Sequence, residues 1–296
     1  MKKWLYISLW LVAVGCEDII DVTLDEAPRA YVVDAWINDK SETQTITLTY
    51  TQEYFDSSTP PPVTGATVFV TDDKGQVFPF VESSAGEYVW VPGSSPATIS
   101  GAGTGYQLTI RADGYEFFAQ SQLNRVPTVD SITYTFEEEQ SPFEPAGYYA
   151  EFVATDLPGP GDTYWIKAYK NGVLLNNPFD LNIAFDAGFN EGGNIDGVVF
   201  IQPIQNAVTP LNDDLDEIVP YVPGDSLYVE IHSITNEAFA FLQQVQIQTQ
   251  RDGGFDEIFA EPLQNVRSNI LTTSDVQVVG FFNVAGVSGR GRRLEE

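Results

Sequence analysis

The side chains best suited to chemistry gather in one glycine-rich acidic loop. Residues 186–197 read DAGFNEGGNIDG. Carboxylate and amide oxygens are the ligands that hard cations such as Ca²⁺ prefer, so this composition makes the loop a candidate calcium site. Its spacing does not follow that of an EF-hand loop, and a plain mobile loop is the alternative. The candidate ligands are Asp186, Asn190, Glu191, Asn194 and Asp196.

Other reactive side chains are scarce. His232 is the single histidine, so a catalytic triad or a histidine-based metal site could have one centre at most. Its position at the end of a predicted strand favours a structural role. We therefore predict no catalytic residue and no cofactor. A glycosidase needs only two carboxylates about 5 to 10 Å apart, and because sequence does not reveal that distance, a carboxylate-based hydrolase stays open as a less favoured alternative.

The single cysteine lies directly after an export signal. Lys2 and Lys3 precede an apolar run from Trp4 to Val14, which is too short to span a bilayer as a helix and is typical of a secretory signal. The run ends in Ala-Val-Gly-Cys, which resembles the lipobox of bacterial lipoproteins. We predict that residues 1–15 are a signal peptide and that Cys16 carries diacylglycerol. A lone thiol in an exported protein needs such an explanation, and two or three acyl chains would anchor the chain firmly.

Net charge excludes one class of partner. The chain has 14 basic and 42 acidic residues, a formal charge of −28, and loss of the two signal lysines makes the mature form two units more negative. Nucleic acid binding depends on clustered lysine and arginine, so no nucleic acid partner is expected. The acidic pair Glu17 and Asp18 after Cys16 resembles a surface-export signal of outer-membrane lipoproteins. We therefore expect a lipid-anchored outer-membrane protein, with the periplasmic and the cell-surface face both left open.

The first half of the mature chain is predicted to be an immunoglobulin-like β-sandwich. Residues 16–28 form the lipidated cysteine and an acidic tether. Between 29 and 125, short alternating segments such as 43–50 (TQTITLTY) are separated by turns, among them Asp113-Gly114, and about seven strands in a hundred residues is the count of such a sandwich. Trp36, Trp90 and Trp165 lie within strand patterns, so we expect them in the cores, with an exposed stacking surface as the alternative.

A second β-rich domain is predicted over 126–290, with residues 291–296 as a tail. Its strands are expected at 131–136, 148–155, 164–170, 173–175, 198–201, 225–231 and 276–282. Asn171-Gly172 is the clearest hairpin signal in the chain. One helix near 236–250 carries apolar residues on one face and ends before two glycines. The chain is therefore predicted to be all-β, with one helix that packs on a sheet.

Two long stretches resemble a known family. Residues 16–37 (CEDIIDVTLDEAPRAYVVDAWI) and residues 233–282, with FDEIFAEPLQNVRSNI and GFFNVAG, are similar to the Bacteroidota lipoproteins of domain of unknown function family 4249. The resemblance covers nearly the whole mature chain but includes no chemical signature. It implies an outer-membrane lipoprotein often encoded beside a TonB-dependent receptor, with an unknown ligand and no catalytic residues to carry over.

Three functions compete. The favoured one is a non-catalytic binding or accessory subunit of a TonB-dependent uptake system, whose second domain and glycine-rich loops would carry the ligand or receptor contacts. The alternative is a surface adhesin or structural lipoprotein, since immunoglobulin-like modules on lipid tethers often serve only to hold surfaces together. The third is the hydrolase, which requires a pocket with two facing carboxylates.

Overall fold

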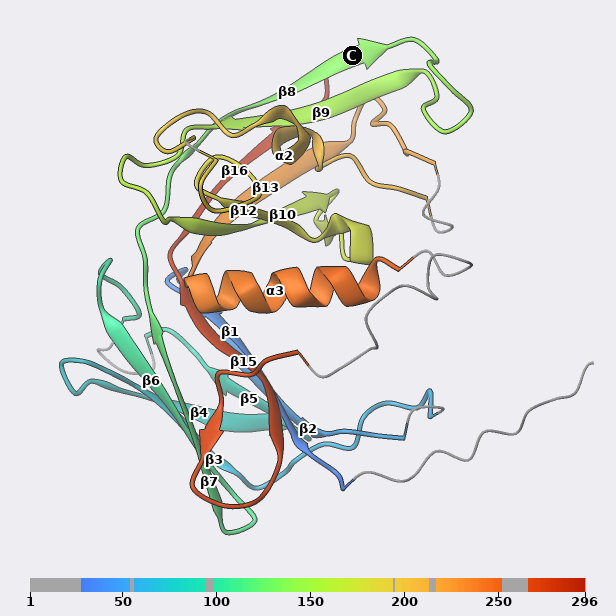
Figure 1. Ribbon diagram of the computed structural model, residues 1–296. Helices are drawn as coiled ribbons and strands as arrows, with labels where there is room; N and C mark the ends of the chain where they lie inside the picture. The colour runs from blue at the N-terminus through green and yellow to red at the C-terminus, as the bar shows by residue number, and fades with distance from the viewer. Residues whose placement is uncertain are drawn as a thin grey trace, which may run out of the picture.

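The computed structural model describes residues 28–53, 56–93, 98–193, 195–212, 217–251 and 266–295. The prediction of an all-β protein is confirmed, because strands dominate the two packed halves seen in Figure 1. Helices are the long α3 (Asn236–Thr249), the short α2 (Gln202–Asn206) and the 3₁₀ turn η2 (Pro178–Asp180). None of the helices in this part of the chain has both the length and the apolar composition needed to cross a bilayer.

A nine-stranded sheet forms the lower half of the molecule in Figure 1, in the order β14-β7-β6-β3-β4-β5-β2-β1-β15. Strand β4 pairs with β3 along its first part and with β5 along its second part, and a bulge interrupts the pairing with β5. The sheet bends around its core at this strand. The strands are β1 (Tyr31–Asn38), β2 (Gln44–Tyr50), β3 (Thr67–Asp72), β4 (Val77–Ser84), β5 (Glu87–Trp90), β6 (Gly105–Ala112), β7 (Tyr115–Gln122), β14 (Leu271–Thr272) and β15 (Val278–Ala285).

Alternation along these strands builds the first core. In β1, Tyr31, Val33, Ala35 and Ile37 are buried, and the side chains between them face the other way. Trp90 is buried in the same core, as predicted. Strands β14 and β15 come from beyond residue 126, so the first sheet takes strands from both ends of the chain. The predicted division into 29–125 and 126–290 stays a prediction, and these two pairings cross it.

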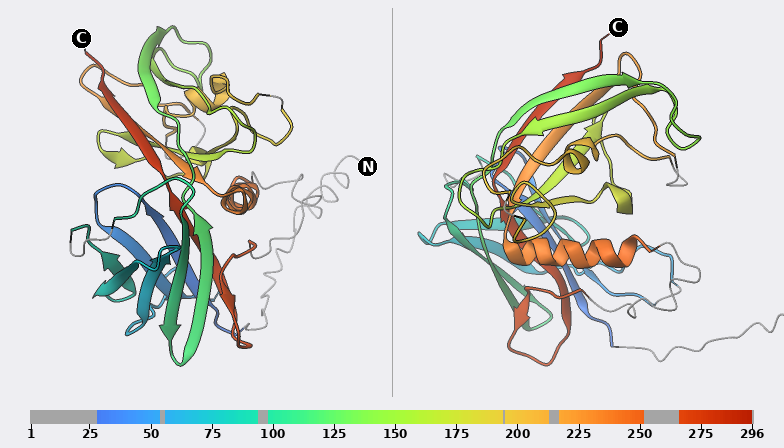
Figure 2. Two further views of the ribbon diagram at one scale, coloured as in Figure 1. Left: turned by 90° about the vertical axis from the view of Figure 1, so that its left-hand side faces the viewer. Right: turned by 45° about the horizontal axis from the view of Figure 1, so that its top comes forward.

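The upper half holds a second sheet, ordered β11-β10-β13-β16 with β12 also paired to β10, and the separate hairpin β8-β9. Only Gly286 separates β15 from β16, so the last stretch of chain passes directly from the first sheet into the second (Figure 2). The strands are β8 (Val129–Glu137), β9 (Gly147–Ala154), β10 (Thr163–Lys170), β11 (Val173–Leu174), β12 (Asn182–Phe185), β13 (Ser226–Ile234) and β16 (Val287–Arg293).

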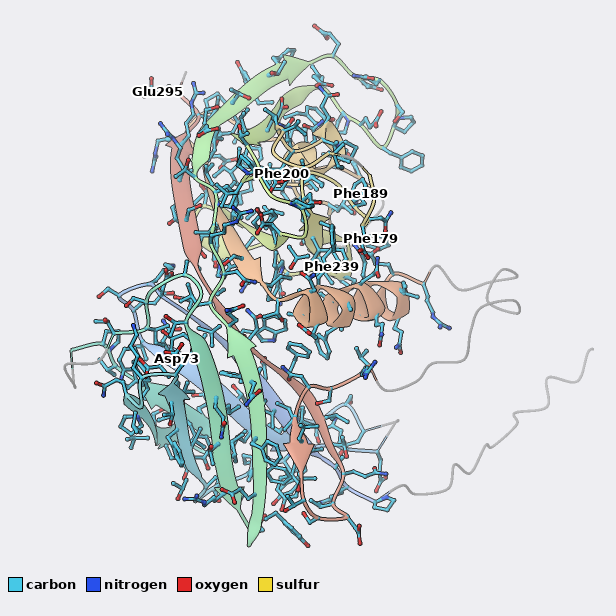
Figure 3. The ribbon with its side chains drawn as sticks, turned by 60° about the vertical axis from the view of Figure 1, so that its left-hand side comes forward. Asp73, Phe179, Phe189, Phe200, Phe239 and Glu295 are labelled. Atoms are coloured by element: carbon cyan, nitrogen blue, oxygen red, sulfur yellow. The ribbon has the colours of Figure 1, made fainter. Side chains whose placement is uncertain are left out.

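Helix α3 lies between the two halves (Figures 1 and 2). Thr235 caps it, because the threonine hydroxyl accepts a hydrogen bond from the Ala238 amide at 3.2 Å. Its buried face packs into a third core with β12, β15 and the end of β13, and Phe239 meets Phe185 at 5.6 Å between ring centres (Figure 3). The predicted helix is therefore confirmed, and its packing on sheet residues is confirmed with it.

Three local predictions differ from the structure. Residues 198–201 were expected to form a strand, but they make only an isolated bridge between Val199 and Thr155. Strand β12 was not predicted, because its four residues are buried on both faces and show no alternation. Residues 291–293, expected in the tail, belong to β16, which pairs with β13 along the edge of the sheet.

Candidate functional site

The structure gathers part of the predicted acidic loop into a cluster. Asp186 and Asp196 lie with Asp156, and one carboxylate oxygen from each is within 4.8 Å of the others. Asp156 and Asp186 are buried, whereas Asp196 is exposed. Asp156, at the end of β9 and 30 residues before Asp186, was not predicted, since a single aspartate followed by a proline- and glycine-rich stretch carries no metal-site spacing.

The protein already binds several oxygens of this acidic cluster. Asp186 Oδ1 accepts hydrogen bonds from the amides of Gly161 and Asp162 at 2.7 and 3.0 Å. Asp156 accepts the Tyr164 hydroxyl at 2.6 Å and the Gly197 amide at 3.0 Å. Burial raises the pKa of Asp156, against those hydrogen bonds. The cluster thus orders the loops around β12, and a cation there would share oxygens that the fold already uses.

The other predicted ligands lie apart from the cluster. Asn190 and Glu191 are exposed in the loop and do not join the three aspartates. Asn194 and the predicted lipidation residue Cys16 lie outside the described residues. The calcium site therefore stays a prediction, with Asp186 and Asp196 as the two residues that the fold brings together.

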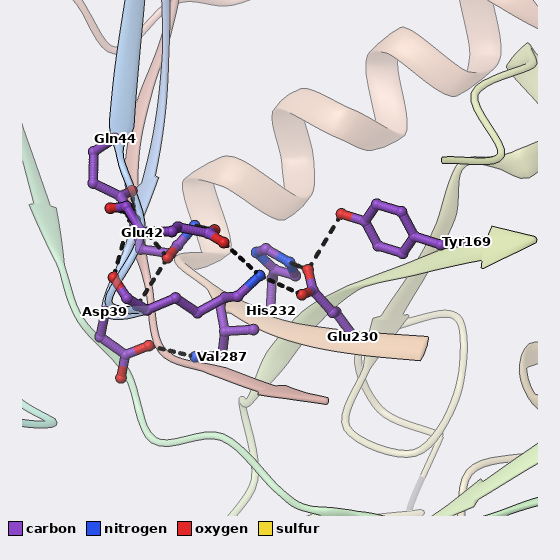
Figure 4. A network of polar contacts seen from close by, with 9 residues as sticks. Asp39, Glu42, Gln44, Tyr169, Glu230, His232 and Val287 are labelled. Carbon is purple, nitrogen blue, oxygen red and sulfur yellow. Dashed lines mark hydrogen bonds and ion pairs between the residues drawn. The ribbon is translucent and has the colours of Figure 1, made fainter. Parts of the chain in front are cut away.

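A second group of polar side chains, the junction network, lies where the two halves meet (Figure 4). It consists of Lys40, Glu42, Tyr169, Glu230 and His232. Lys40 Nζ, from the loop after β1, binds Glu230 Oε1 at 2.6 Å and Glu42 Oε2 at 2.9 Å. On the other side, Glu230 Oε2 accepts from His232 Nε2 at 2.9 Å and from the Tyr169 hydroxyl at 3.3 Å. One carboxylate thereby joins the first half to strands β10 and β13.

Burial and charge set the protonation of this network. The Glu230 side chain is only 3% exposed. Burial alone would raise its pKa, but hydrogen bonds and charge from His232 and Lys40 outweigh that effect and lower the pKa of Glu230 to about 2. Burial lowers the pKa of His232, against its hydrogen bond to Glu230. His232 is therefore neutral at pH 7, with the proton on Nε2, because a carboxylate only accepts hydrogen bonds.

Aromatic side chains continue the junction toward α3. Trp36 meets Trp165 at 5.2 Å and stacks on Phe281 at 5.6 Å between ring centres. Lys167 Nζ lies 3.8 Å from the centre of the Trp165 ring, and burial lowers the pKa of Lys167 to about 8. Trp36 and Trp165 pack against the third core, as predicted, but each is only half-buried.

The junction encloses a small cavity beside these rings. Its volume is about 10 Å³, which is room for one water molecule and too little for a substrate. Trp36, Trp165, His232 and Asn283 are among its lining residues. Asn283 is fully buried, and its Nδ2 is one of the few buried polar atoms of the described chain without a hydrogen-bond partner. The geometry is suited to coupling the two halves.

As the pH falls, the folded protein should first lose stability because of His232, at a pH above the range in which the carboxylates titrate. Because the folded pKa of His232 is lowered, the unfolded chain binds a proton that the folded chain does not as pH falls below 6.5. Stability should therefore fall by up to about 1.4 kcal/mol per pH unit there. Glu230 adds a further loss between pH 4.5 and about 2. Urea unfolding of the parent and a His232→Gln variant from pH 8 to 5 checks this, since the glutamine variant should lose the slope below 6.5, and equal slopes would contradict it.

The comparison with known proteins adds a family. Residues 17–290 match the family described as a domain of unknown function, DUF4249. No curated protein matches the chain. The match begins one residue after Cys16 and covers both sheets, α3 and the junction network. The chain therefore belongs to the DUF4249 family.

Proposed function

We propose that this protein is an exported lipoprotein, anchored through Cys16, that acts as a non-catalytic binding or accessory subunit of a TonB-dependent uptake system in the outer membrane. The observation that carries the proposal is the order of the segments. A basic start, an apolar run and Ala-Val-Gly-Cys precede the family region, which starts at residue 17. Two or three acyl chains on Cys16 would hold the family region at the membrane surface.

An apolar surface at the far end of the second half is the proposed receptor contact. It lies at the loop end of the β8-β9 hairpin and is called the hairpin tip here. Phe136 and Phe143 are 52% and 57% exposed, and Val222 is 59% exposed. The Ile218 amide donates to the Phe143 carbonyl at 3.0 Å, which holds the 218–222 segment against the hairpin. Exposed aromatic side chains grouped in this way are typical of protein interfaces.

The test is co-purification of the lipidated protein. The chain would be expressed in a bacterium that encodes TonB-dependent receptors of its own. It would then be extracted from the outer membranes in mild detergent. Proteins recovered in near-equal amount would then be identified by mass spectrometry. We expect a TonB-dependent barrel in that fraction, and we expect a Cys16→Ser variant to leave the membrane fraction. Recovery of the anchored protein alone would refute a stable receptor complex and would favour the adhesin.

Matched variants locate the contact. Phe143→Asp should reduce the recovered barrel at least tenfold, because burying an unpaired carboxylate in an interface is costly. Leu271→Asp places the same charge on an exposed residue, 56% accessible, at the edge of the first sheet. It should leave recovery unchanged. If both variants recover the barrel equally well, the hairpin tip is not the contact.

A further inference from the structure

A groove lies on the outer face of the first sheet. Its volume is about 430 Å³, within the range of small-molecule sites. Strands β3, β6 and β7 form its floor, and Asp72 and Asp73 close one end at the turn after β3. Figure 3 shows Asp73 in the lower, N-terminal half of the molecule. The predicted sites included none of these residues.

Two rows of side chains cross this face. In the first, Phe69 on β3, Thr109 on β6 and Phe118 on β7 are direct cross-strand neighbours. Phe69 and Phe118 are half-buried and Thr109 between them is only 6% exposed, so the row is a partly open apolar strip, with the Arg111 guanidinium over the Phe69 ring. Cross-strand neighbours lie about 5 Å apart, so the two rings are separated by roughly 10 Å, with the threonine methyl between them.

The second row is polar and lies one pleat along the strands, about 7 Å away. It consists of Thr71, Gln107 and Gln120, again as direct cross-strand neighbours. Each glutamine amide offers two donors and one acceptor, and the threonine hydroxyl offers both. Within the described part of the chain, these three side chains make no hydrogen bond to the protein. They are therefore free to bind a ligand.

Charge and topology narrow the class of ligand. No basic residue is among the described lining. Arg111 lies next to it, with its guanidinium 5.6 Å from the centre of the Phe69 ring and paired with Glu116 at 3.0 Å. Asp72 and Asp73 would repel an anion. Strands β3 and β6 are hydrogen-bonded on both sides, so neither offers a free backbone edge to a peptide strand. Recognition must come from side chains, through one apolar row and one row of neutral donors and acceptors.

We infer that this groove binds a neutral saccharide. A pyranose ring has an apolar face of C–H groups and an equatorial rim of hydroxyls, and the two rows match these in order. The ring stacks on Phe69, hydroxyls exchange hydrogen bonds with Gln107 and Gln120, and the carboxylates of Asp72 and Asp73 accept from hydroxyls at the end of the groove. This deepens the proposed function, on which it rests for its biological setting, by naming the class of ligand.

The mature lipidated chain should be tested directly against sugars. It would be purified in a detergent without a sugar head group and titrated, by calorimetry and by ligand-observed NMR, with neutral hexasaccharides of glucose, mannose and xylose in different linkages. Spermidine is included as a cationic probe. We expect at least one hexasaccharide to bind with a Kd below about 1 mM, which corresponds to a binding free energy of about −4 kcal/mol. Binding of spermidine alone, or of no probe, would overturn the inference.

Variants tie the binding to the groove. Phe69→Ala should weaken binding at least tenfold and Gln107→Ala at least threefold. Val81→Ala, on β4 of the same sheet and 66% exposed outside the groove, should bind as the parent does. Equal affinity of the Phe69→Ala variant would overturn the assignment. Co-purification of the receptor does not depend on this assay, so a chain that recovers the barrel but binds no sugar contradicts only the ligand class.

Discussion

Replacing Gly280 by alanine is expected to destabilise the protein by about 4 kcal/mol or more, enough to unfold much of a typical domain. Gly280 lies in β15 opposite Val33 of β1, with a φ of +101°. A Cβ at this position would lie 1.9 Å from the Val33 carbonyl oxygen, so the backbones of the two strands could not keep their spacing. Val33 and its neighbours on the same face of β1, Tyr31 and Ala35, are buried in the core, which leaves little room for β1 to move.

The effect should reach both halves of the molecule. β1 and β15 pair in parallel from Tyr31 and Val278 to Asn38 and Ala285, and β15 leads through Gly286 into β16 of the second sheet. Loss of this register therefore also displaces the strand that covers β13. The paired residues of β1 and β15 are about 250 residues apart in sequence. A hairpin cannot join two parallel strands, so no local pairing can replace this one.

Gly75→Ala is the matched control. Gly75 also has a positive φ, +81°, but nothing lies within 4 Å of the position that its Cβ would take. The loss of stability in Gly75→Ala should therefore reflect backbone strain alone, about 1 kcal/mol. Denaturant unfolding of the parent and both variants compares them. A Gly280→Ala variant as stable as Gly75→Ala would show that the contact between β1 and β15 is not needed for the fold.

Local chemistry accounts for the parts of the fold that sequence could predict. Asn171 and Gly172 have φ values of 53° and 82°, and Asp113 and Gly114 have 52° and 84°, which are the positive values that a tight hairpin turn requires and that these residues tolerate best. The helix prediction rested on the period of the apolar residues and on the two glycines that follow it in sequence, and the structure adds a threonine cap at Thr235. Each of these signals involves neighbours in the chain.

Long-range pairing accounts for the parts that sequence could not predict. The residues of β16, VSGRGRR, carry no strand signal, and they form a strand because the exposed edge of β13 holds them by backbone hydrogen bonds. Gly289 and Gly291 are needed there for space, since Tyr228 of β13 lies over both. A glycine- and arginine-rich terminus reads as a tail when the partner strand is unknown.

The candidate sites divide in the same way. The acidic loop was visible because its carboxylates are close in sequence, whereas Asp156 is held beside them by contacts distant in sequence, the Thr155–Val199 bridge and the Gly197 amide. His232 was predicted to be structural from its isolation. Its partners in the junction network could not be predicted, since Lys40 and Glu230 are 190 residues apart. The saccharide groove likewise depends on the register of three strands, which places alternate residues in rows.

Replacing Lys40 by methionine is expected to cost about 3 kcal/mol. The lysine side chain is 31% exposed, so methionine keeps most of its packing, but Glu230 loses the cation that lies 2.6 Å from its carboxylate. A carboxylate that is 3% exposed would then keep the hydrogen bonds from the neutral His232 and the Tyr169 hydroxyl, with Lys167 as its cross-strand neighbour but without an ion pair in the described structure. Removing one partner of a buried ion pair is more costly than removing both, because the remaining charge stays out of water.

Two further variants separate charge from packing. Lys74→Met, at the exposed turn between β3 and β4, removes a lysine that makes no ion pair in the described structure and should change stability by less than about 0.5 kcal/mol. Adding Glu230→Gln to Lys40→Met should restore about 2 kcal/mol, since the amide needs no counter-ion. Urea unfolding at pH 7 of the parent, Lys40→Met, Glu230→Gln and the double variant completes this double-mutant cycle, with Lys74→Met as the control.

The pH dependence of the Lys40→Met penalty distinguishes an electrostatic role of Lys40 from a packing role. Without Lys40, Glu230 keeps its hydrogen bond from His232 but loses the hydrogen bond and charge of the lysine, so its folded pKa should rise from about 2 toward the 4.5 of the unfolded chain. A folded carboxyl pKa below the unfolded value contributes stability that is present above the unfolded value and is lost as pH falls through the folded value. The penalty of Lys40→Met should therefore be full above pH 4.5 and shrink as pH falls from 4.5 toward 2. A penalty constant across this range, with no rescue by Glu230→Gln, would mean that Lys40 stabilises the junction by packing alone.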